Sequence, residues 1–220
     1  MPGRASQTSH LVSALREHGG VRRYRRGEAL FSEGDIGDRV FLIERGWVII
    51  RSADATGDDV VLGLRGPGEV LGELSALDGR PRSASAIALA DVDAVVTSAE
   101  HLNRTLAADA RAGRELLIVV ADRLREADRR RLEFATKDAL GRVATRLLEL
   151  AERFGEPTDD GVRVELPLAQ EDLAGWCGAS RESTVRALGT LRRLGVVTTA
   201  RRAVTIHDEG SLRRAARGAA

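Results

Sequence analysis

Residues 168–188 read LAQEDLAGWCGASRESTVRAL, and this stretch decides the fold of the C-terminal part of the chain. It predicts two short helices that meet at a tight turn. Leu173 and Ala174 belong to the first helix, and Gly178 supplies the turn. Ser180 can cap the second helix, because its side-chain oxygen can accept from a free backbone N–H. This order of residues is typical of a helix-turn-helix.

The second helix is predicted to pack Val185, Leu188 and either Leu191 or Arg192 into the core. Polar side chains then face outward near its N-terminus, where a recognition helix meets base edges in the major groove. Arginine can pair bidentately with guanine and glutamate can accept from cytosine, each contact discriminating by ~1 to 3 kcal/mol. The predicted DNA-contacting residues are Ser180, Arg181, Glu182, Thr184, Arg186, Arg201 and Arg202. The alternative is a helix corner whose charges only face water.

The residues after this helix predict a β-hairpin with a basic tip. Val196 and Val197 precede the tip, and Val204 and Ile206 follow it. The tip contains two adjacent arginines, which suit contact with phosphate. The hairpin would therefore be the wing of a winged helix-turn-helix, although many such modules bind proteins instead.

Charge is concentrated in this C-terminal region. From Gly178 to Ala220 nine arginines stand against three acidic residues, nine minus three or +6, whereas the whole chain carries only +1. Binding to nucleic acid depends on such local clusters of cations. Aromatic residues make up only 3% of the chain, which disfavours stacking on single strands or RNA loops. Duplex DNA is the predicted partner.

Length and composition indicate a folded protein of two domains. The chain has 220 residues, of which 43% are hydrophobic and 30% charged. Met1 to His10 lacks the apolar segment of a signal peptide, and no apolar run approaches the ~20 residues that a bilayer requires. We therefore expect a cytoplasmic location and no membrane partner. The single cysteine, Cys177, is expected to be a small buried filler.

The N-terminal half predicts an antiparallel barrel or sandwich after a short helix at residues 7–18. Glycine and aspartate clusters separate short runs rich in valine, isoleucine and leucine. These runs are Val40–Ile43, Trp47–Arg51, Val60–Leu64, Ser85–Leu89 and Ala94–Thr97.

A long helix is predicted from about Ala110. One stripe of this helix, with steps of three and four residues, consists of Leu117, Val120, Leu124, Ala127, Arg131 and Phe134. That spacing is typical of a coiled-coil seam, so the helix can pair with its own copy, or it can lie on the core of its own domain. Asp138 can cap the next helix, which runs to about Arg153. Three segments are therefore predicted. Residues 1–108 form the N-terminal helix and the barrel or sandwich, residues 109–136 form the long helix for dimerisation, and residues 137–220 form the domain that contains the helix-turn-helix and its wing.

The sequence resembles the CRP/FNR family, the cyclic-AMP receptor proteins and their relatives, over nearly its whole length. Gly178-Ala179-Ser180-Arg181-Glu182 followed by Arg186 is similar to the recognition helix of that family. Gly68 to Leu77 and Arg80 to Ala84 resemble its phosphate-binding cassette. The resemblance implies an α+β fold: an N-terminal antiparallel β-roll of the cyclic-nucleotide-binding type (a double-stranded β-helix), a long dimerisation helix and a C-terminal winged helix-turn-helix.

The cassette has a physical rationale of its own. Gly72 to Leu77 can begin a short helix whose free N–H groups attract an anion, and Arg82 with Ser83 can supply charge-assisted donors to a phosphate. Glu73 would then accept from a ribose hydroxyl. Alternatively, Glu73 and Arg82 form an ion pair with each other in a roll that binds nothing.

The predicted ligand is a cyclic nucleotide, with cyclic AMP first, and no metal. The predicted ligand contacts are Gly72, Glu73, Leu74, Arg82, Ser83, Ala84, Ala127 and Asp128. Cyclic-AMP responders of the family have adjacent hydroxyl or amide side chains that reach adenine, where this chain has Ala127 and Asp128. Asp128 can accept from an exocyclic amine, but Ala127 offers no polar atom. Another nucleotide, weaker cyclic-AMP binding and constitutive DNA binding all stay open.

We therefore expect a homodimeric transcriptional regulator and no enzyme. A cupin-type enzyme would need metal ligands, but Arg22 to Glu100 contains no histidine, and no nucleotide-hydrolysis loop or nucleophilic triad is visible. Ligand in the roll would bias the pairing of the long helices, and the joint at Phe134 to Asp138 would pass that bias to the DNA-binding domains. RNA polymerase is an expected partner if the protein activates. The remaining alternative is a nucleotide-sensing module that acts on a partner protein.

Overall fold

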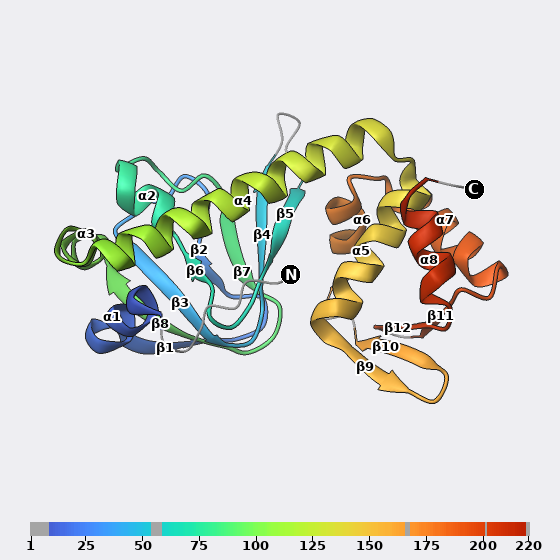
Figure 1. Cartoon of the computed structure of the whole chain (residues 1–220), viewed down its shortest axis with the longest axis horizontal. Coiled ribbons are helices and arrows are strands. Elements are labelled where there is room, and N and C mark those ends of the chain that lie inside the picture. Colours follow the sequence, from blue (N-terminus) through green and yellow to red (C-terminus); the bar gives the residue numbers. More distant parts are fainter. Residues whose placement is uncertain (1–8, 54–58, 166–167, 201, 219–220) are drawn as a thin grey trace. The chain divides into compact units, whose positions relative to one another are not determined.

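The computed structural model describes residues 9–53, 59–165, 168–200 and 202–218. Its contacts divide the chain into two compact units, Met1–Arg125 and Glu126–Ala220 (Figure 1). The division falls within one long helix, whereas the sequence predicted that helix as a segment of its own. Each unit is described separately below.

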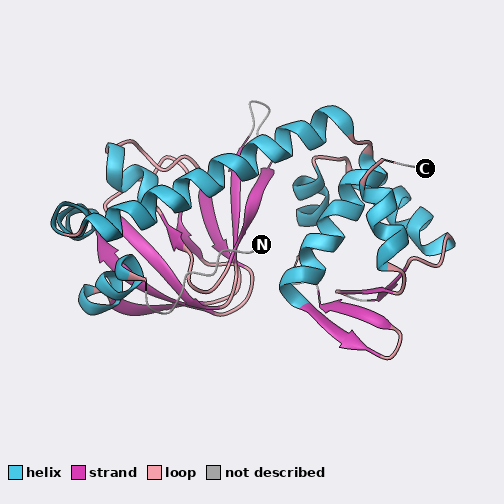
Figure 2. Cartoon of the chain, viewed as in Figure 1, coloured by secondary structure: helices cyan, strands magenta, loops and turns pink. Residues whose placement is uncertain are grey.

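The first unit contains two antiparallel sheets of four strands each (Figure 2). The first sheet has the order β1-β8-β3-β6, formed by β1 (Gly20–Tyr24), β8 (Val92–Ser98), β3 (Arg39–Arg45) and β6 (Val70–Leu71). The second has the order β2-β7-β4-β5, formed by β2 (Ala29–Phe31), β7 (Ser85–Ala88), β4 (Val48–Ala53) and β5 (Asp59–Arg65). Residues from both sheets, including Phe41 and Val48, share one buried cluster, so the two sheets enclose a common core.

Helices cover this unit at one side. They are α1 (His10–His18), α2 (Glu73–Asp78), α3 (Ala99–Ala108) and the first part of α4 (Ala110–Thr136). Leu11 and Leu15 of α1, Leu102 of α3 and Leu116 of α4 pack with strand residues in a second buried cluster. Glu115 of α4 also accepts from the Leu11 N–H at 2.8 Å, which fastens the start of α1 to the long helix.

The exposed face of α4 carries the stripe that the sequence predicted. Leu117, Leu124 and Phe134 are 71%, 59% and 48% exposed in the single chain. The helix contains no proline, and its only glycine, Gly113, lies in its first turns. The long helix is therefore confirmed, and its apolar stripe faces outward.

The second unit combines four further helices with a small sheet. The helices are α5 (Ala139–Phe154), α6 (Gln170–Cys177), α7 (Arg181–Arg193) and α8 (Glu209–Ala216). The sheet has the order β11-β12-β10-β9, formed by β11 (Val197–Ala200), β12 (Ala203–Ile206), β10 (Gly161–Glu165) and β9 (Gly155–Thr158). Its core includes Leu147 and Leu150 of α5, Leu191 of α7 and Ile206 of β12, each at most 2% exposed.

These elements confirm the α+β fold class, with an antiparallel roll followed by a winged helix-turn-helix. The Asp138 carboxylate accepts from the Gly141 N–H at 2.8 Å and caps α5, as the sequence predicted. The sequence did not reveal β9 or α8. The sequence predicted that Gly155 and Pro157 follow the end of a helix, and α5 does end at Phe154 with Gly155 as its C-cap. Both residues also belong to β9, an edge strand, which is a position where proline is tolerated.

Within the described residues, no helix is long and apolar enough to span a bilayer.

Candidate ligand cavity and nucleic-acid interface

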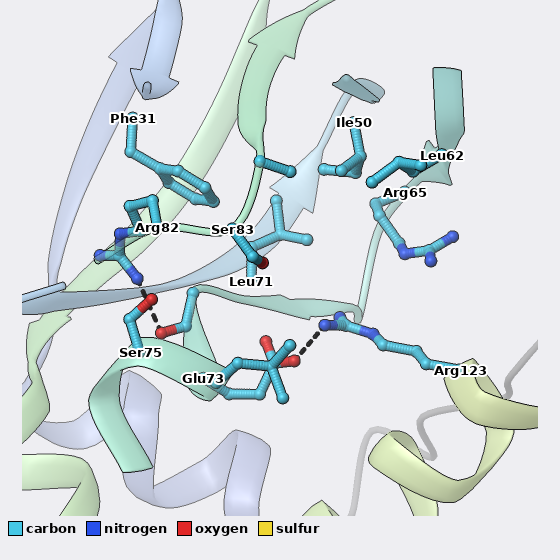
Figure 3. A pocket seen from close by; sticks show the side chains of 13 residues that line it. Phe31, Ile50, Leu62, Arg65, Leu71, Glu73, Ser75, Arg82, Ser83 and Arg123 are labelled. Carbon is cyan, nitrogen blue, oxygen red and sulfur yellow. Dashed lines mark hydrogen bonds and ion pairs between the residues drawn. The ribbon is translucent and has the colours of Figure 1, made fainter. Parts of the chain in front are cut away.

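A cavity of about 160 Å³ lies in the first unit beside α2 (Figure 3). It is lined by Phe31, Ile50, Leu62, Arg65, Leu71, Gly72, Glu73, Leu74, Ser75, Arg82, Ser83, Ala84 and Arg123. Six of the predicted ligand contacts, Gly72 to Leu74 and Arg82 to Ala84, are therefore brought together. They come from the start of α2 and from the segment before β7, which are separated by seven residues in the sequence.

Arg82 is a buried cation, and no ion pair joins its guanidinium to an acidic side chain among the described residues. Its guanidinium donates to the Gly72 carbonyl at 2.8 Å and the Arg39 carbonyl at 2.5 Å, and it lies 4.5 Å from the Phe31 ring centroid. Its Nε is buried without a hydrogen-bond partner among the described residues. Burial is the main cause that lowers the pKa of Arg82, since a charged group is costly to desolvate. An anion in the cavity would relieve this cost.

Glu73 is also buried, with 0% of its surface exposed. One oxygen, Oε1, accepts from Arg123 of α4, whereas Oε2 has no hydrogen-bond partner among the described residues. The alternative of a Glu73–Arg82 ion pair is therefore wrong, because Arg123 takes the place next to Glu73 and Arg82 holds backbone carbonyls. An unpaired buried carboxylate oxygen is positioned to accept from a hydroxyl donor.

Arg123 is a residue of the cavity lining that the sequence analysis missed. It stands on the long helix, 50 positions from Glu73, and it also donates to the Val70 carbonyl. No local pattern marks it, because it lies outside the cassette and off the apolar stripe. Its contact with Glu73 ties α4 directly to the cavity wall.

Ala127 and Asp128 are exposed on α4, and the described cavity lining includes neither. Asp128 accepts from Arg131 at 3.2 Å on the same helix. Their predicted role in ligand binding stays a prediction.

The helix-turn-helix has the turn glycine and the capping serine that the sequence predicted. Gly178 ends α6 in the left-handed region, with φ at 54°, and Ser180 caps α7 by accepting from the Ser183 N–H at 3.2 Å. Arg181, Glu182 and Arg186 are exposed on the first turns of α7. These side chains are accessible for contact with a nucleic acid.

Thr184 was predicted to contact DNA, and the structure contradicts this prediction. Its side chain is 2% exposed, so it packs inside the unit, while Val185, predicted as core, is 45% exposed. The buried positions of α7 are Thr184, Ala187, Leu188 and Leu191, spaced by three, one and three residues. Because the core face is rotated by one position, Thr184 does not face outward with its neighbours.

The hairpin after α7 is the expected wing, with Ala200 paired to Ala203 across its end. Arg202 is exposed at the tip with φ at 57°, in the left-handed region that favours glycine. An arginine in this region has a higher conformational energy than a glycine would have, so the positive charge at the tip comes with backbone strain. Arg201, also predicted to contact DNA, lies outside the described residues.

The end of α4 is joined to the helix-turn-helix within the second unit. Arg142 of α5 donates to the Lys137 carbonyl at 2.6 Å, to the Cys177 carbonyl at 2.7 Å and to the Gly178 carbonyl at 3.2 Å. The Phe134 ring packs on Gly178, and the Arg142 guanidinium lies 5.3 Å from the ring centroid. The predicted joint at Phe134 to Asp138 is thus connected to the turn of the helix-turn-helix by one arginine.

A second, buried connection lies beside it. Arg146 of α5 donates to Glu133 of α4 and, at 2.7 Å, to Glu149. The ring of Trp176 in α6 lies 5.4 Å from the Arg146 guanidinium. The last turns of α4 therefore pack as part of the DNA-binding unit.

Among the described residues, no group of three or more histidine, cysteine or acidic side chains is placed to hold a metal ion.

Comparisons with known proteins find one family match within each of the two units. Residues 21–109 match the cyclic nucleotide-binding domain, and residues 141–215 match the Crp-like helix-turn-helix domain. A CRP-like cAMP-activated global transcriptional regulator of Mycobacterium tuberculosis is 36% identical over 87% of this chain and 86% of that protein. The cyclic AMP receptor protein of Thermus thermophilus is 32% identical over 90% of this chain and 89% of its own.

A solved structure, that of TTHB099, a CRP-family transcriptional regulator from Thermus thermophilus, covers 89% of this chain and 96% of its own. Its TM-score is 0.77 at 26% identity. The roll with its cassette, the helix-turn-helix with its capped second helix, and these relatives lead to one conclusion: the chain belongs to the CRP/FNR family of DNA-binding transcriptional regulators.

Proposed function

We propose that this chain is a homodimeric transcriptional regulator, not an enzyme, which reads an operator of two-fold symmetry under the control of a cyclic nucleotide. One observation carries the ligand part of this proposal. Arg82 Nε and Glu73 Oε2 are buried polar atoms without partners among the described residues, and both belong to the lining of one cavity. A ligand with an anionic group and a hydroxyl group could pair with both atoms, the anion with Arg82 and the hydroxyl with Glu73.

A cyclic nucleotide has this combination of groups. Its phosphate would lie against Arg82 and Ser83, and its ribose hydroxyl would donate to Glu73. Gly72, Leu74 and Ala84 would shape the cavity around it, while Ala127 and Asp128 are proposed to lie near the base. The names of the relatives in Mycobacterium tuberculosis and Thermus thermophilus support cyclic AMP as one ligand to test.

The DNA part of the proposal rests on α7 and the wing. Arg181, Glu182 and Arg186 would contact base edges, while Ser180 and the arginines of the wing, Arg201 and Arg202, would contact phosphate. Two such helices, one from each protomer, would enter successive major grooves about 34 Å apart. The exposed stripe of α4 supports this symmetric pairing, because Leu117 and Leu124 would leave water in a dimer.

Control would pass along α4. Arg123 joins this helix to Glu73 in the cavity wall, and Glu133 joins the same helix to Arg146 in the DNA-binding unit. A ligand with different affinity for two arrangements of the paired helices would shift the population between them. We also propose a cytoplasmic location and, if the protein activates, contact with RNA polymerase.

The test begins with duplexes that the wild-type protein selects from a random pool. Fluorescence anisotropy then compares a selected duplex with a scrambled one, with and without cyclic nucleotide. Arg181→Ala is expected to lose about tenfold or more of the preference for the selected duplex while it keeps salt-sensitive background binding. Arg45→Ala, which removes an exposed arginine of β3 that is paired with Asp93, is the matched control.

Full sequence preference in Arg181→Ala would refute the assignment of α7. If no cyclic nucleotide changes the affinity of the wild-type protein for its selected duplex, the constitutive alternative holds and nucleotide control is refuted.

A further inference from the structure

Trp176 connects three helices of the DNA-binding unit. It stands near the end of α6, the first helix of the helix-turn-helix, and it is buried. The guanidinium of Arg130, on α4, lies 5.8 Å from the centroid of its ring, and that of Arg146, on α5, lies 5.4 Å from it. Both distances are within the ~6 Å at which a cation is attracted to an aromatic face. One ring therefore joins α6 to the last turns of α4 and to α5.

Carboxylates hold both arginines in place at this ring. Arg130 donates to Glu126 at 2.7 Å, and both side chains are mostly buried. Arg146 donates to Glu133 and, at 2.7 Å, to Glu149. A guanidinium binds a carboxylate through its N–H groups and stacks on an aromatic ring through its planar face. The ion pairs and the ring contacts therefore use different parts of the same group, and the ion pairs fix the cations beside the ring.

Hydrogen bonding does not explain why a tryptophan stands at this position. Its Nε1 is buried and has no hydrogen-bond partner among the described residues, although buried donors in proteins usually have one. An indole, however, has a large aromatic face, and it attracts cations more strongly than the other aromatic side chains. The contact with two guanidiniums accounts for the residue where its polar group does not.

The recognition helix follows directly along the chain. α6 ends at Cys177, Gly178 forms the turn, and α7 begins at Arg181. The place of α6 therefore determines where the exposed side chains of α7 lie relative to the last turns of α4.

We infer that Trp176 is a positioning residue for DNA recognition: Arg130 and Arg146 hold its ring, and the ring fixes the helix-turn-helix to the end of α4. Without this contact each α7 keeps its own groups for base recognition. In a symmetric dimer, two copies of α7 must enter grooves about 34 Å apart, so the orientation of each helix-turn-helix on its α4 decides whether both copies bind at once. The inference goes beyond the proposed function and rests on its symmetric dimer.

The experiment compares two duplexes by fluorescence anisotropy with the full-length protein. One carries the complete two-fold site that the wild-type protein selects, and the other carries only half of that site. Arg130→Met removes the cation and should weaken binding to the complete site about fivefold or more, since the loss of a cation–π contact at a buried ring corresponds to a change of about that size. Binding to the half-site should change by no more than about twofold, because α7 is intact. Arg130→Lys keeps a cation and should restore most of the affinity for the complete site.

Substitutions of the ring supply a second comparison. Trp176→Phe keeps an aromatic face and should bind the complete site within about threefold of the wild-type protein. Trp176→Leu keeps an apolar side chain without that face and should lose about fivefold or more on the complete site alone. Arg125→Met is the matched control, because it removes an exposed arginine of α4 that pairs with Asp122 at 2.7 Å. It should change neither affinity.

The ratio of the two affinities separates positioning from general damage. Equal losses on both duplexes in Arg130→Met and Trp176→Leu would show damage to the whole unit and would overturn the positioning role. Unchanged affinity of either variant for the complete site would overturn it as well, while the wild-type preference for the complete site would leave the symmetric dimer standing. Equal affinity of the wild-type protein for the two duplexes would contradict the dimer and the inference together.

Discussion

Arg82 shows how one residue can have a structural and a ligand-facing role. The sequence predicted a phosphate donor, but its guanidinium also holds two backbone carbonyls and stacks on Phe31. Such a residue cannot be removed without some loss of stability, since each buried carbonyl left unpaired costs ~1–3 kcal/mol. Ligand binding by its variants must therefore be measured on protein shown to be folded.

Cys177 gives a prediction at the same scale. Burial raises the pKa of its thiol from 9.0 to about 12. Because the folded pKa lies above the unfolded one, the contribution to stability is complete below about pH 9 and is lost as the pH rises through about 12. The slope for this one group is about 1.4 kcal/mol per pH unit in that window.

Urea unfolding of the wild-type protein and of Cys177→Ala between pH 8 and pH 11 tests this prediction. The wild-type protein should lose stability more steeply above about pH 9. The comparison is needed because burial also raises the pKa of Tyr24, which both proteins share. Parallel profiles, or rapid reaction of the native thiol with an aromatic disulfide, would contradict the burial argument.

Residue identities were easier to predict than their orientations. Gly178 and Ser180 were predictable because their roles follow from local backbone geometry. Thr184 was assigned to the wrong face because a short stretch of alternating polar and apolar residues fits two rotations of the helix. Arg123 could not be predicted, since its role depends on Glu73, which is close only in the folded chain.

Among the elements, α4 makes a close connection with α5 through buried charges. Glu133 is 5% exposed and Arg146 is 2% exposed, and they form an ion pair. Removing one partner of a buried pair costs about 3–5 kcal/mol when the other charge is left uncompensated, and it costs less here because Arg146 keeps Glu149 at 2.7 Å. Replacing both by apolar residues of similar size costs much less.

A double-mutant cycle checks this connection. Glu133→Leu is expected to lower the free energy of unfolding by less than about 3–5 kcal/mol, because Glu149 still pairs with Arg146, and the double variant with Arg146→Met should recover part of that loss. Glu100→Leu, which breaks an exposed pair with Arg104 at 3.9 Å, should change stability by less than about 1 kcal/mol. Additive effects of the two buried substitutions would show that the pair is not coupled.

The elements themselves were largely predictable where the hydrophobic pattern is long or the turns are marked by glycine. The long helix and five strands of the roll were predicted in this way, and Gly72 marks the start of α2. In contrast, β1 is an edge strand with four of its five residues exposed, so it carries no alternating pattern. The alanine- and arginine-rich segment that forms α8 was read only as a source of charge.

For the whole molecule, the stripe on α4 makes the oligomeric state testable. Leu124 is 59% exposed in one chain and would become buried twice in a symmetric dimer. Each buried leucine contributes about 1.5–3 kcal/mol, so Leu124→Glu should weaken the dimer about 100-fold or more. Sedimentation velocity over a range of protein concentrations measures this shift, and operator affinity should fall with it.

Asp122→Lys is the control, because it also changes a charge on the exposed surface of α4 but stands off the stripe. It should leave the association unchanged. A wild-type protein that sediments as a monomer at every concentration would contradict the symmetric dimer, as would a Leu124→Glu variant that associates normally.

The placement of Glu133 and Phe134 with the DNA-binding unit also constrains how regulators of this design can exchange their sensors. A chimaera spliced at Lys137 would take Arg146 without Glu133, one of its two carboxylate partners, and would leave Gly178 without the ring that covers it. A splice before Glu126 transfers both contacts intact. The DNA-binding unit therefore begins inside the long helix, at Glu126. A boundary drawn between α4 and α5 would fall more than one helical turn later.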